Sequence, residues 1–90
     1  MLIKYGRKFA KRYDKVDLKI RNAFKNRLKL FMKDPFNALL NNHSLIGEYT
    51  GFRSINVTGD WRAIFSELVD DEGNKIVIFE MIGTHSELYR

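Results

Sequence analysis

The residue types best suited to proton transfer stand at the end of the sequence, in the stretch MIGTHSELYR, residues 81–90. His85 follows an apolar run and precedes Tyr89 by four positions, so a helical turn would bring both side chains to one face. An imidazole and a phenol together can hold and pass a proton, and a histidine with its ordinary pKa of about 6.5 is the usual acid or base near neutral pH. The alternative interpretation of His85 is a capping or surface role.

A second candidate is the arginine within GDWRAIF, residues 59–65. Successive side chains of a strand point to opposite faces, so Trp61 and Arg62 separate, and Arg62 falls in the middle of the expected sheet. A charge at such a place is either paired or turned toward an open groove. Two interpretations therefore stay open: a structural ion pair with Asp60 or Glu80, or a cation that meets a ligand.

Charge is distributed unevenly along the chain. The net charge is +5, but residues 1–33 carry +10 while residues 34–90 carry −5. Such asymmetry indicates a polyanionic partner, either a nucleic acid or an acidic protein surface. The alternative is a solvated helical face that lysines keep soluble.

The composition excludes several classes of protein. Without cysteine there is no disulfide framework and no thiolate chemistry, and two histidines are too few for the usual zinc site. We therefore expect no metal and no cofactor. No signal peptide or membrane span is recognisable, so we expect a soluble, cytoplasmic protein without a membrane partner. Ninety residues suffice for one modest core, so a single domain over residues 1–90 is expected.

The N-terminal third is predicted to form a strand and two helices. Residues 2–5 (LIKY) read as a short strand, and apolar residues at helical spacing after Gly6 predict a short first helix. Asp14 is expected to cap a second helix over residues 15–33, with Asp17 three positions on in a capping-box arrangement.

The second helix carries two stripes of opposite character. Apolar side chains that recur every three or four positions form the expected buried stripe: Ile20, Ala23, Phe24, Leu28, Phe31 and Met32. Four cations, each four positions apart, form what we call the cationic ridge: Arg21, Lys25, Lys29 and Lys33. Like charges at that spacing repel one another mildly, so the ridge favours the interpretation with an anionic partner.

The rest of the chain is predicted to be mainly strand. Pro35 ends the second helix, and His43 then lies in an irregular connection with one helical turn. From residue 51 the apolar period becomes 2, and GFRSINV, the turn TGD and WRAIFSELV together predict a hairpin. After a second turn, KIVIFEMI is apolar enough for a strand buried on both faces in mid-sheet.

These elements give the order β-α-α-β-β-β with a short C-terminal element. The predicted fold class is α+β: a small, antiparallel-rich sheet with the two N-terminal helices packed on one face.

Two stretches of the sequence carry a resemblance to a known family. LIGEYTGFRSINVTGDWRAIF, with IGTHSELY after it, resembles the RelE/ParE superfamily of bacterial toxins and, within it, the YafQ-like toxins of type II toxin–antitoxin systems. The resemblance covers essentially the whole chain and implies a RelE-like fold. Its specific parts are the L-x-G-x-x-x-G-x-R stretch, the G-D-W-R stretch and the G-T-H-S-x-L-Y ending.

The resemblance implies a ribosome-dependent messenger RNA endoribonuclease that needs no metal. In this chemistry the 2′-hydroxyl attacks the adjacent phosphate, and the 5′-oxygen of the next nucleotide leaves. The reaction requires a base for the hydroxyl, donors or a cation for the phosphorane, and an acid for the leaving oxygen.

Residue roles follow from the resemblance position by position. His43, Asp60, Trp61 and His85 match functional positions of the YafQ-like branch, and Tyr89 falls where that branch has a functional aromatic residue. We expect His43 or Asp60 to be the base and His85 the acid, with Tyr89 orienting the imidazole or passing the proton.

Two positions depart from the YafQ-like pattern. Arg62 matches the cation that RelE-like members use on the phosphate, where YafQ itself is apolar, and is expected to stabilise the charge of the transition state. Asn56 stands where the branch has a further histidine. Its amide can donate to a phosphate oxygen but cannot take a proton, so a mechanism with three histidines is excluded.

RNA binding is expected on two kinds of side chain. The cationic ridge is predicted to contact ribosomal RNA phosphates, and Asn56 to contact the substrate RNA. Trp61, Phe52 or Tyr49 is predicted to stack on a codon base, with ordinary core packing as the alternative for each.

The resemblance also implies the partners: a cognate antitoxin, the ribosome and messenger RNA, with DNA reached only through the antitoxin. Two alternatives to the nuclease remain open. One is a ParE-like toxin that inhibits DNA gyrase, and the other is a degenerate toxin that only binds its antitoxin.

Overall fold

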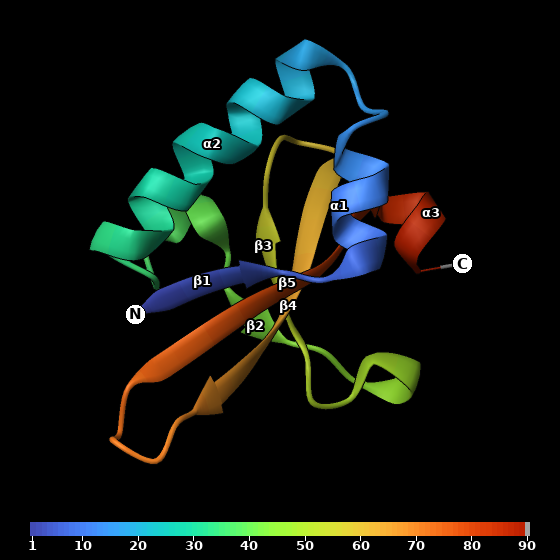
Figure 1. Ribbon diagram of the computed structural model, residues 1–90. Helices are drawn as coiled ribbons and strands as arrows, with labels where there is room; N and C mark the ends of the chain where they lie inside the picture. The colour runs from blue at the N-terminus through green and yellow to red at the C-terminus, as the bar shows by residue number, and fades with distance from the viewer. Residues whose placement is uncertain (90) are drawn as a thin grey trace.

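A computed structural model describes residues 1–89 and shows an α+β fold with one five-stranded sheet (Figure 1). The elements follow one another along the chain as β1 (Leu2–Tyr5), α1 (Arg7–Tyr13), α2 (Leu18–Lys33), β2 (His43–Ser44), β3 (Arg53–Asn56), β4 (Trp61–Val69), β5 (Lys75–Thr84) and α3 (His85–Leu88). The predicted fold class is confirmed. Within the described residues, no helix is long and apolar enough to cross a bilayer.

The sheet has the strand order β1-β5-β4-β3-β2. Neighbouring strands are antiparallel except for β1, which pairs in parallel with β5 from Leu2 opposite Ile76 onward. The predicted hairpin of β3 and β4 is confirmed, and β5 is an interior strand of the sheet, as predicted. The sheet therefore brings the first and last strands of the chain together.

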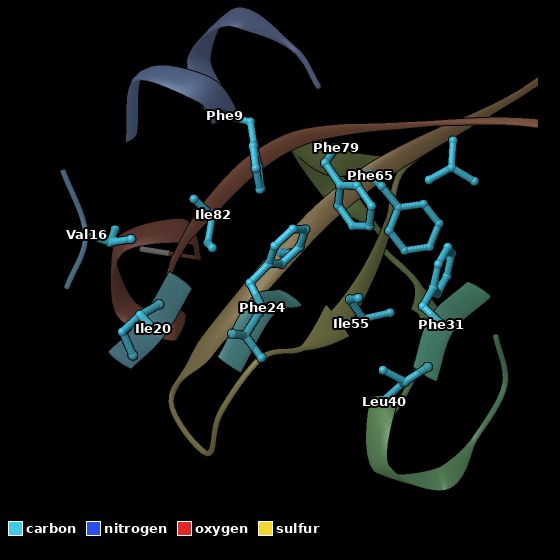
Figure 2. Close-up of a cluster of buried hydrophobic side chains, with 13 residues drawn as sticks. Phe9, Val16, Ile20, Phe24, Phe31, Leu40, Ile55, Phe65, Phe79 and Ile82 are labelled. Atoms are coloured by element: carbon cyan, nitrogen blue, oxygen red, sulfur yellow. The ribbon is translucent and has the colours of Figure 1, made fainter. Parts of the chain in front are cut away.

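The hydrophobic core lies between the sheet and the helices α1 and α2 (Figure 2). Phe9 of α1 and Phe24 and Phe31 of α2 meet Phe65 and Phe79 of the sheet, with ring centroids 5.1–6.0 Å apart in the contacting pairs. These rings bury large apolar areas and pack at the tilted and edge-on angles that aromatic pairs favour. The centre of this face of the sheet is thus buried in the core, while Glu67, Val69 and Lys75 at the far end of the β4–β5 hairpin stay exposed.

A β-bulge in β5 decides which residues lie on that core face. Ile64 pairs with Met81 and Phe65 with Phe79, so Glu80 has no partner on β4. A bulge lets two successive residues share a face. Ser66, which lies on the face that turns away from the helices, donates a hydrogen bond to Glu80. After the bulge the alternation is reversed, so that Ile82 joins the core while Met81 turns away from it.

The start of α2 differs from the prediction. Asp14 ends α1 instead of capping α2, and α2 begins after Asp17, whose side chain makes no capping hydrogen bond. The predicted capping box is wrong because Lys15 and Val16 donate their backbone N–H groups to carbonyls of α1 and Val16 is buried, which fixes a turn between the helices. The buried stripe is confirmed at its centre, but Met32 is exposed.

Two predictions about the strands also need correction. The connection that contains His43 forms two short 3₁₀ turns, at Ala38–Leu40 and Gly47–Tyr49, and a fifth strand, β2, that the sequence did not predict. β5 is fully buried only on its helix side, because Ile76 and Ile78 on the other side stay half-exposed.

Removal of a core ring should be costly. We expect Phe79→Ala to destabilise the fold by about 3 to 5 kcal/mol, because the ring is fully buried among other aromatic rings. The midpoint of thermal unfolding should fall by more than about 10 °C, measured by circular dichroism. The matched control Phe36→Ala removes a ring that is 69% exposed and should cost less than about 1 kcal/mol. Equal losses in both variants would contradict this account of the core.

Candidate active site

The polar candidates lie on the face of the sheet that turns away from α1 and α2. Residues directly opposite one another on paired strands point to the same face. Across the strands β2, β3, β4 and β5, His43 is opposite Ser54, Ser54 is opposite Ile64, and Ile64 is opposite Met81. None of these four side chains belongs to the helix-side core. We call this surface the open face.

A second row of the open face holds Asn56 and Arg62. Asn56 lies two residues beyond Ser54 on β3 and is directly opposite Arg62 on β4, which in turn is opposite Gly83. Because strand side chains repeat with period 2, this row is parallel to the row of His43. The sheet therefore places His43, Asn56 and Arg62 on one surface.

Hydrogen bonding fixes the orientation of His43. Its Nδ1 lies 2.8 Å from the carbonyl oxygen of Asn41, which can only accept, so Nδ1 carries the proton when the ring is neutral. Asn41 holds this carbonyl in place with a left-handed backbone, at a φ of 46°. Nε2 is then the acceptor, and since His43 is exposed, this atom can take a proton from a ligand.

Arg62 is held by backbone carbonyls rather than by a carboxylate. Its Nη1 donates to the oxygens of Thr58, Gly59 and Trp61 at 3.0–3.2 Å. Within residues 1–89 it forms no ion pair with Asp60 or Glu80, so the predicted alternative of such an ion pair is wrong. The guanidinium keeps its full positive charge and offers its other N–H groups to an anion.

The last helix brings His85 and Tyr89 to the same surface. Their rings are 4.8 Å apart between centroids, as the spacing of four predicted. The Tyr89 hydroxyl donates to Oγ of Ser54 at 3.2 Å, which ties the end of the chain to β3. Ser54 is fully buried, so this hydrogen bond satisfies a polar group that would otherwise be costly.

A capping box holds α3 in place. The Thr84 hydroxyl accepts from the backbone N–H of Glu87, and the Glu87 carboxylate accepts from the N–H of Thr84. Glu87 also forms an ion pair with Arg12 of α1. The hydrogen bond from the Thr84 backbone lowers the pKa of Glu87 below its ordinary value. The Thr84 hydroxyl and Arg12 lower this pKa further, by smaller amounts.

Asp60 contributes to the site through its backbone. It lies in the exposed turn before β4, and its carbonyl oxygen accepts the N–H of His85 at 2.9 Å. Asp60 therefore helps to position the first residue of α3.

Asn56 is only partly exposed, and its Oδ1 is buried with no hydrogen-bond partner among residues 1–89. An unpaired buried amide oxygen costs stability.

Two sets of predicted RNA-binding residues lie elsewhere. Trp61 points to the core face, where it packs against the core and the guanidinium of Arg12 lies 5.6 Å from its ring. It is thus separated from His43 and Arg62 by the thickness of the sheet. The cationic ridge lies on α2, also behind the sheet; Lys25, Lys29 and Lys33 are exposed, and Arg21 is half-buried.

The structure adds residues that sequence reasoning did not select. Ser54 joins β3 to Tyr89, and Tyr49 packs edge-on against Tyr89 with centroids 5.9 Å apart. Burial raises the pKa of the Tyr49 phenol, with smaller contributions from Glu48 and Tyr89, so the phenol stays protonated at neutral pH. The alternation of Ser54 and Asn56 with Ile55 and Val57 is the signal that could have identified Ser54.

The site thus combines two imidazoles, His43 and His85, with the guanidinium of Arg62, and groups of these kinds can transfer protons and bind an anion. Within the described residues, no group of three His, Cys, Asp or Glu side chains could hold a metal ion.

A solved structure of a small bacterial toxin has the same fold as this chain. The YoeB/ParE toxin from Agrobacterium tumefaciens superposes with a TM-score of 0.75 at 15% identity, over 94% of this chain and 99% of that one. The fold is therefore the RelE-like fold. A comparison with curated proteins gives no match.

The family follows from the sequence and from more similar structures. Residues 1–90 match the family model for the bacterial toxin of type II toxin–antitoxin systems, YafQ, so the chain belongs to the YafQ toxin family. YafQ from E. coli strain BL21(DE3) is 28% identical over 98% of this chain and 97% of that one, with a TM-score of 0.71. The E. coli DinJ–YafQ complex gives 27% identity over 98% of this chain and 97% of that one, with a TM-score of 0.69.

The Glu87 capping box makes a prediction about pH. A carboxyl group whose pKa is lowered by folding stabilises the fold above its unfolded pKa of about 4.3, and this contribution is lost as the pH falls through the folded value. We therefore expect Glu87→Gln to lower the urea midpoint at pH 7 and the difference from wild type to shrink below about pH 4.

The control is Glu67→Gln, which breaks the other ion pair, with Lys75 at the distal end of the β4–β5 hairpin. This change should leave the signals of Tyr89 in a nuclear magnetic resonance spectrum unmoved, whereas Glu87→Gln should shift them. A Glu87→Gln effect of equal size at pH 3 and pH 7 would contradict the role of the charge.

Proposed function

We propose that the protein is a ribosome-dependent endoribonuclease that cuts messenger RNA by attack of a 2′-hydroxyl on its adjacent phosphate. The observation that carries this proposal is that His43 and Arg62 share the open face, and that Tyr89, which contacts His85, is hydrogen-bonded to Ser54 of that face. Membership of the YafQ family supports it. The site would act in the cytoplasm and would need no metal or cofactor.

The hydrogen bond to Asn41 favours His43 over Asp60 as the base. With Nδ1 donating, Nε2 of His43 is ready to accept the proton of the 2′-hydroxyl. Asp60 instead serves through its carbonyl, which holds the backbone of His85.

Arg62 and His85 would complete the reaction. Arg62 is anchored through one nitrogen, so its remaining donors can stabilise the negative charge of the phosphorane without a loss of position. His85 would donate a proton to the leaving 5′-oxygen, and Tyr89, tied to Ser54, would keep the imidazole in place. Asn56 would donate its amide N–H to a phosphate oxygen.

The partners follow from the relatives and from charge. The E. coli relative is solved in complex with DinJ, and we propose that this chain likewise binds a cognate antitoxin. The cationic ridge lies behind the sheet, so it could contact ribosomal RNA while the open face meets the messenger. DNA would be reached only through the antitoxin.

The acid role of His85 makes the first prediction here. Loss of a general acid costs about 10² to 10⁴ in rate, so His85→Ala should lower cleavage by at least about 100-fold. The measurement is the mapping of messenger RNA ends after expression in bacteria, with wild type as the reference. Cuts within translated codons should vanish in the variant.

The same experiment separates the alternatives. Growth arrest with DNA damage and intact messenger RNA would overturn the nuclease in favour of a gyrase inhibitor. Asn56, which replaces a histidine of the branch, is the feature that favours a degenerate toxin. Normal growth with intact messenger RNA would support that alternative.

The choice between the two bases has its own test. His43→Gln removes the proton acceptor and should lower the single-turnover rate with ribosomes by about 100-fold or more. Asp60→Asn keeps the backbone carbonyl that His85 needs and should lower it by less than about tenfold. The reverse order of the two effects would assign the base to Asp60.

The cationic ridge should affect binding alone. Replacement of its four residues by Gln removes up to four phosphate contacts, so ribosome affinity should fall and its salt dependence should become shallower by up to about 3 to 4 in log–log slope. The cleavage rate of the bound complex, measured in a single turnover, should stay within about twofold. A collapse of that rate would make the ridge part of the chemistry.

A further inference from the structure

A hollow of about 420 Å³ lies on the open face beside the candidate active site. Its size is within the range of about 300 to 1,000 Å³ that is typical of small-molecule sites. Ile64 and Met81 belong to its lining, and both stand in the row of His43 and Ser54. The hollow is therefore continuous with the surface that would hold the scissile phosphate.

Two aromatic rings line this hollow. Tyr49 and Phe52 come from the connection between β2 and β3 and stand edge-on to each other, with centroids 6.5 Å apart. Tyr49 also contacts Tyr89, which ties the hollow to the site. Aromatic side chains stack on nucleobases, and each such contact contributes about 1 to 3 kcal/mol.

The β-bulge turns a carboxylate into the same hollow. Glu80 shares the open face with Met81, and its Oε2 accepts from Ser66 at 3.2 Å. Gly6 leaves the room for this side chain, because a Cβ at that position would lie 2.6 Å from Oε1. An ionised carboxylate only accepts hydrogen bonds, so it favours a partner with N–H groups.

The rim of the hollow carries charges of both signs. Arg7 and Lys8, at the start of α1, line it together with Glu48, which stands beside Tyr49 in the chain. The two cations match the phosphates of an RNA strand. A stacking wall, an acceptor and these cations together match a nucleotide better than an apolar peptide segment.

We propose that this hollow is a nucleobase subsite, which receives a base of the messenger beside the cut and prefers adenine, cytosine or guanine over uracil. The three preferred bases present an amino group that can donate to Glu80, while uracil presents carbonyl oxygens on both sides of its one N–H group. The inference rests on the proposed nuclease function for the source of the RNA. The binding itself does not depend on catalysis.

The first test uses RNA that cannot be cut. Trinucleotides of adenine and of uracil, both with 2′-O-methyl groups, are titrated into the isotope-labelled protein and followed by nuclear magnetic resonance. The adenine probe should shift the signals of Tyr49, Phe52 and Met81 and bind about tenfold more tightly than the uracil probe. Equal affinities, or shifts confined to other residues, would overturn the subsite.

Two variants test the two parts of the subsite, the carboxylate and the aromatic wall, and a third variant is the control. Glu80→Gln should reduce the preference for adenine to less than about threefold, and Tyr49→Leu should weaken both probes by about tenfold. The control Tyr5→Leu changes a half-exposed tyrosine on the core side and should leave both affinities unchanged. A preference that survives in Glu80→Gln, or unchanged binding in Tyr49→Leu, would contradict the assignment.

A second test separates this inference from the proposed function. Messenger RNA ends are mapped after cleavage with ribosomes by the wild type and by Glu80→Gln. More cuts beside uracil in the variant would support the subsite, and an unchanged profile would overturn it while the nuclease stands. If the wild type makes no cuts but still prefers the adenine probe, the nuclease function fails and the subsite remains.

Discussion

Glu80 of β5, which has no partner on β4, determines which of the following β5 side chains lie on each face of the sheet. With strict alternation, Met81 would follow Phe79 into the core and Ile82 would lie on the open face. The bulge at Glu80 reverses this phase, so that Ile82 packs under the helices and Gly83 stands opposite Arg62. Bulges are frequent beside active sites because they redirect side chains in this way.

The sheet consequently separates two kinds of surface. Its core face is sealed by aromatic rings and by α1 and α2, which also carry most of the positive charge. Its open face holds a row of polar groups, bordered by the connection after β2, by α3 and by the start of α1. The polar groups of the open face and the positive charges of α2 can therefore be altered independently.

The spacing of apolar residues along the sequence was sufficient to predict the regular helix and strands. The apolar stripe of α2 and the alternation in β3 and β4 gave the helix, the hairpin and the opposite orientation of Trp61 and Arg62. The turn between α1 and α2, strand β2 and the bulge depend on contacts between distant segments, which local patterns do not encode. For the same reason the sequence could not place His43 opposite Ser54, nor show that Trp61 packs away from the site.

The parallel pairing of β1 with β5 has a consequence for the order of folding. Leu2 meets Ile76 only after the chain between them has been organised, and contacts between such distant residues form slowly because a long loop must first close. Arg12 follows β1 closely and holds Glu87 of α3. The arrangement around His85 thus depends on contacts that join the two ends of the chain.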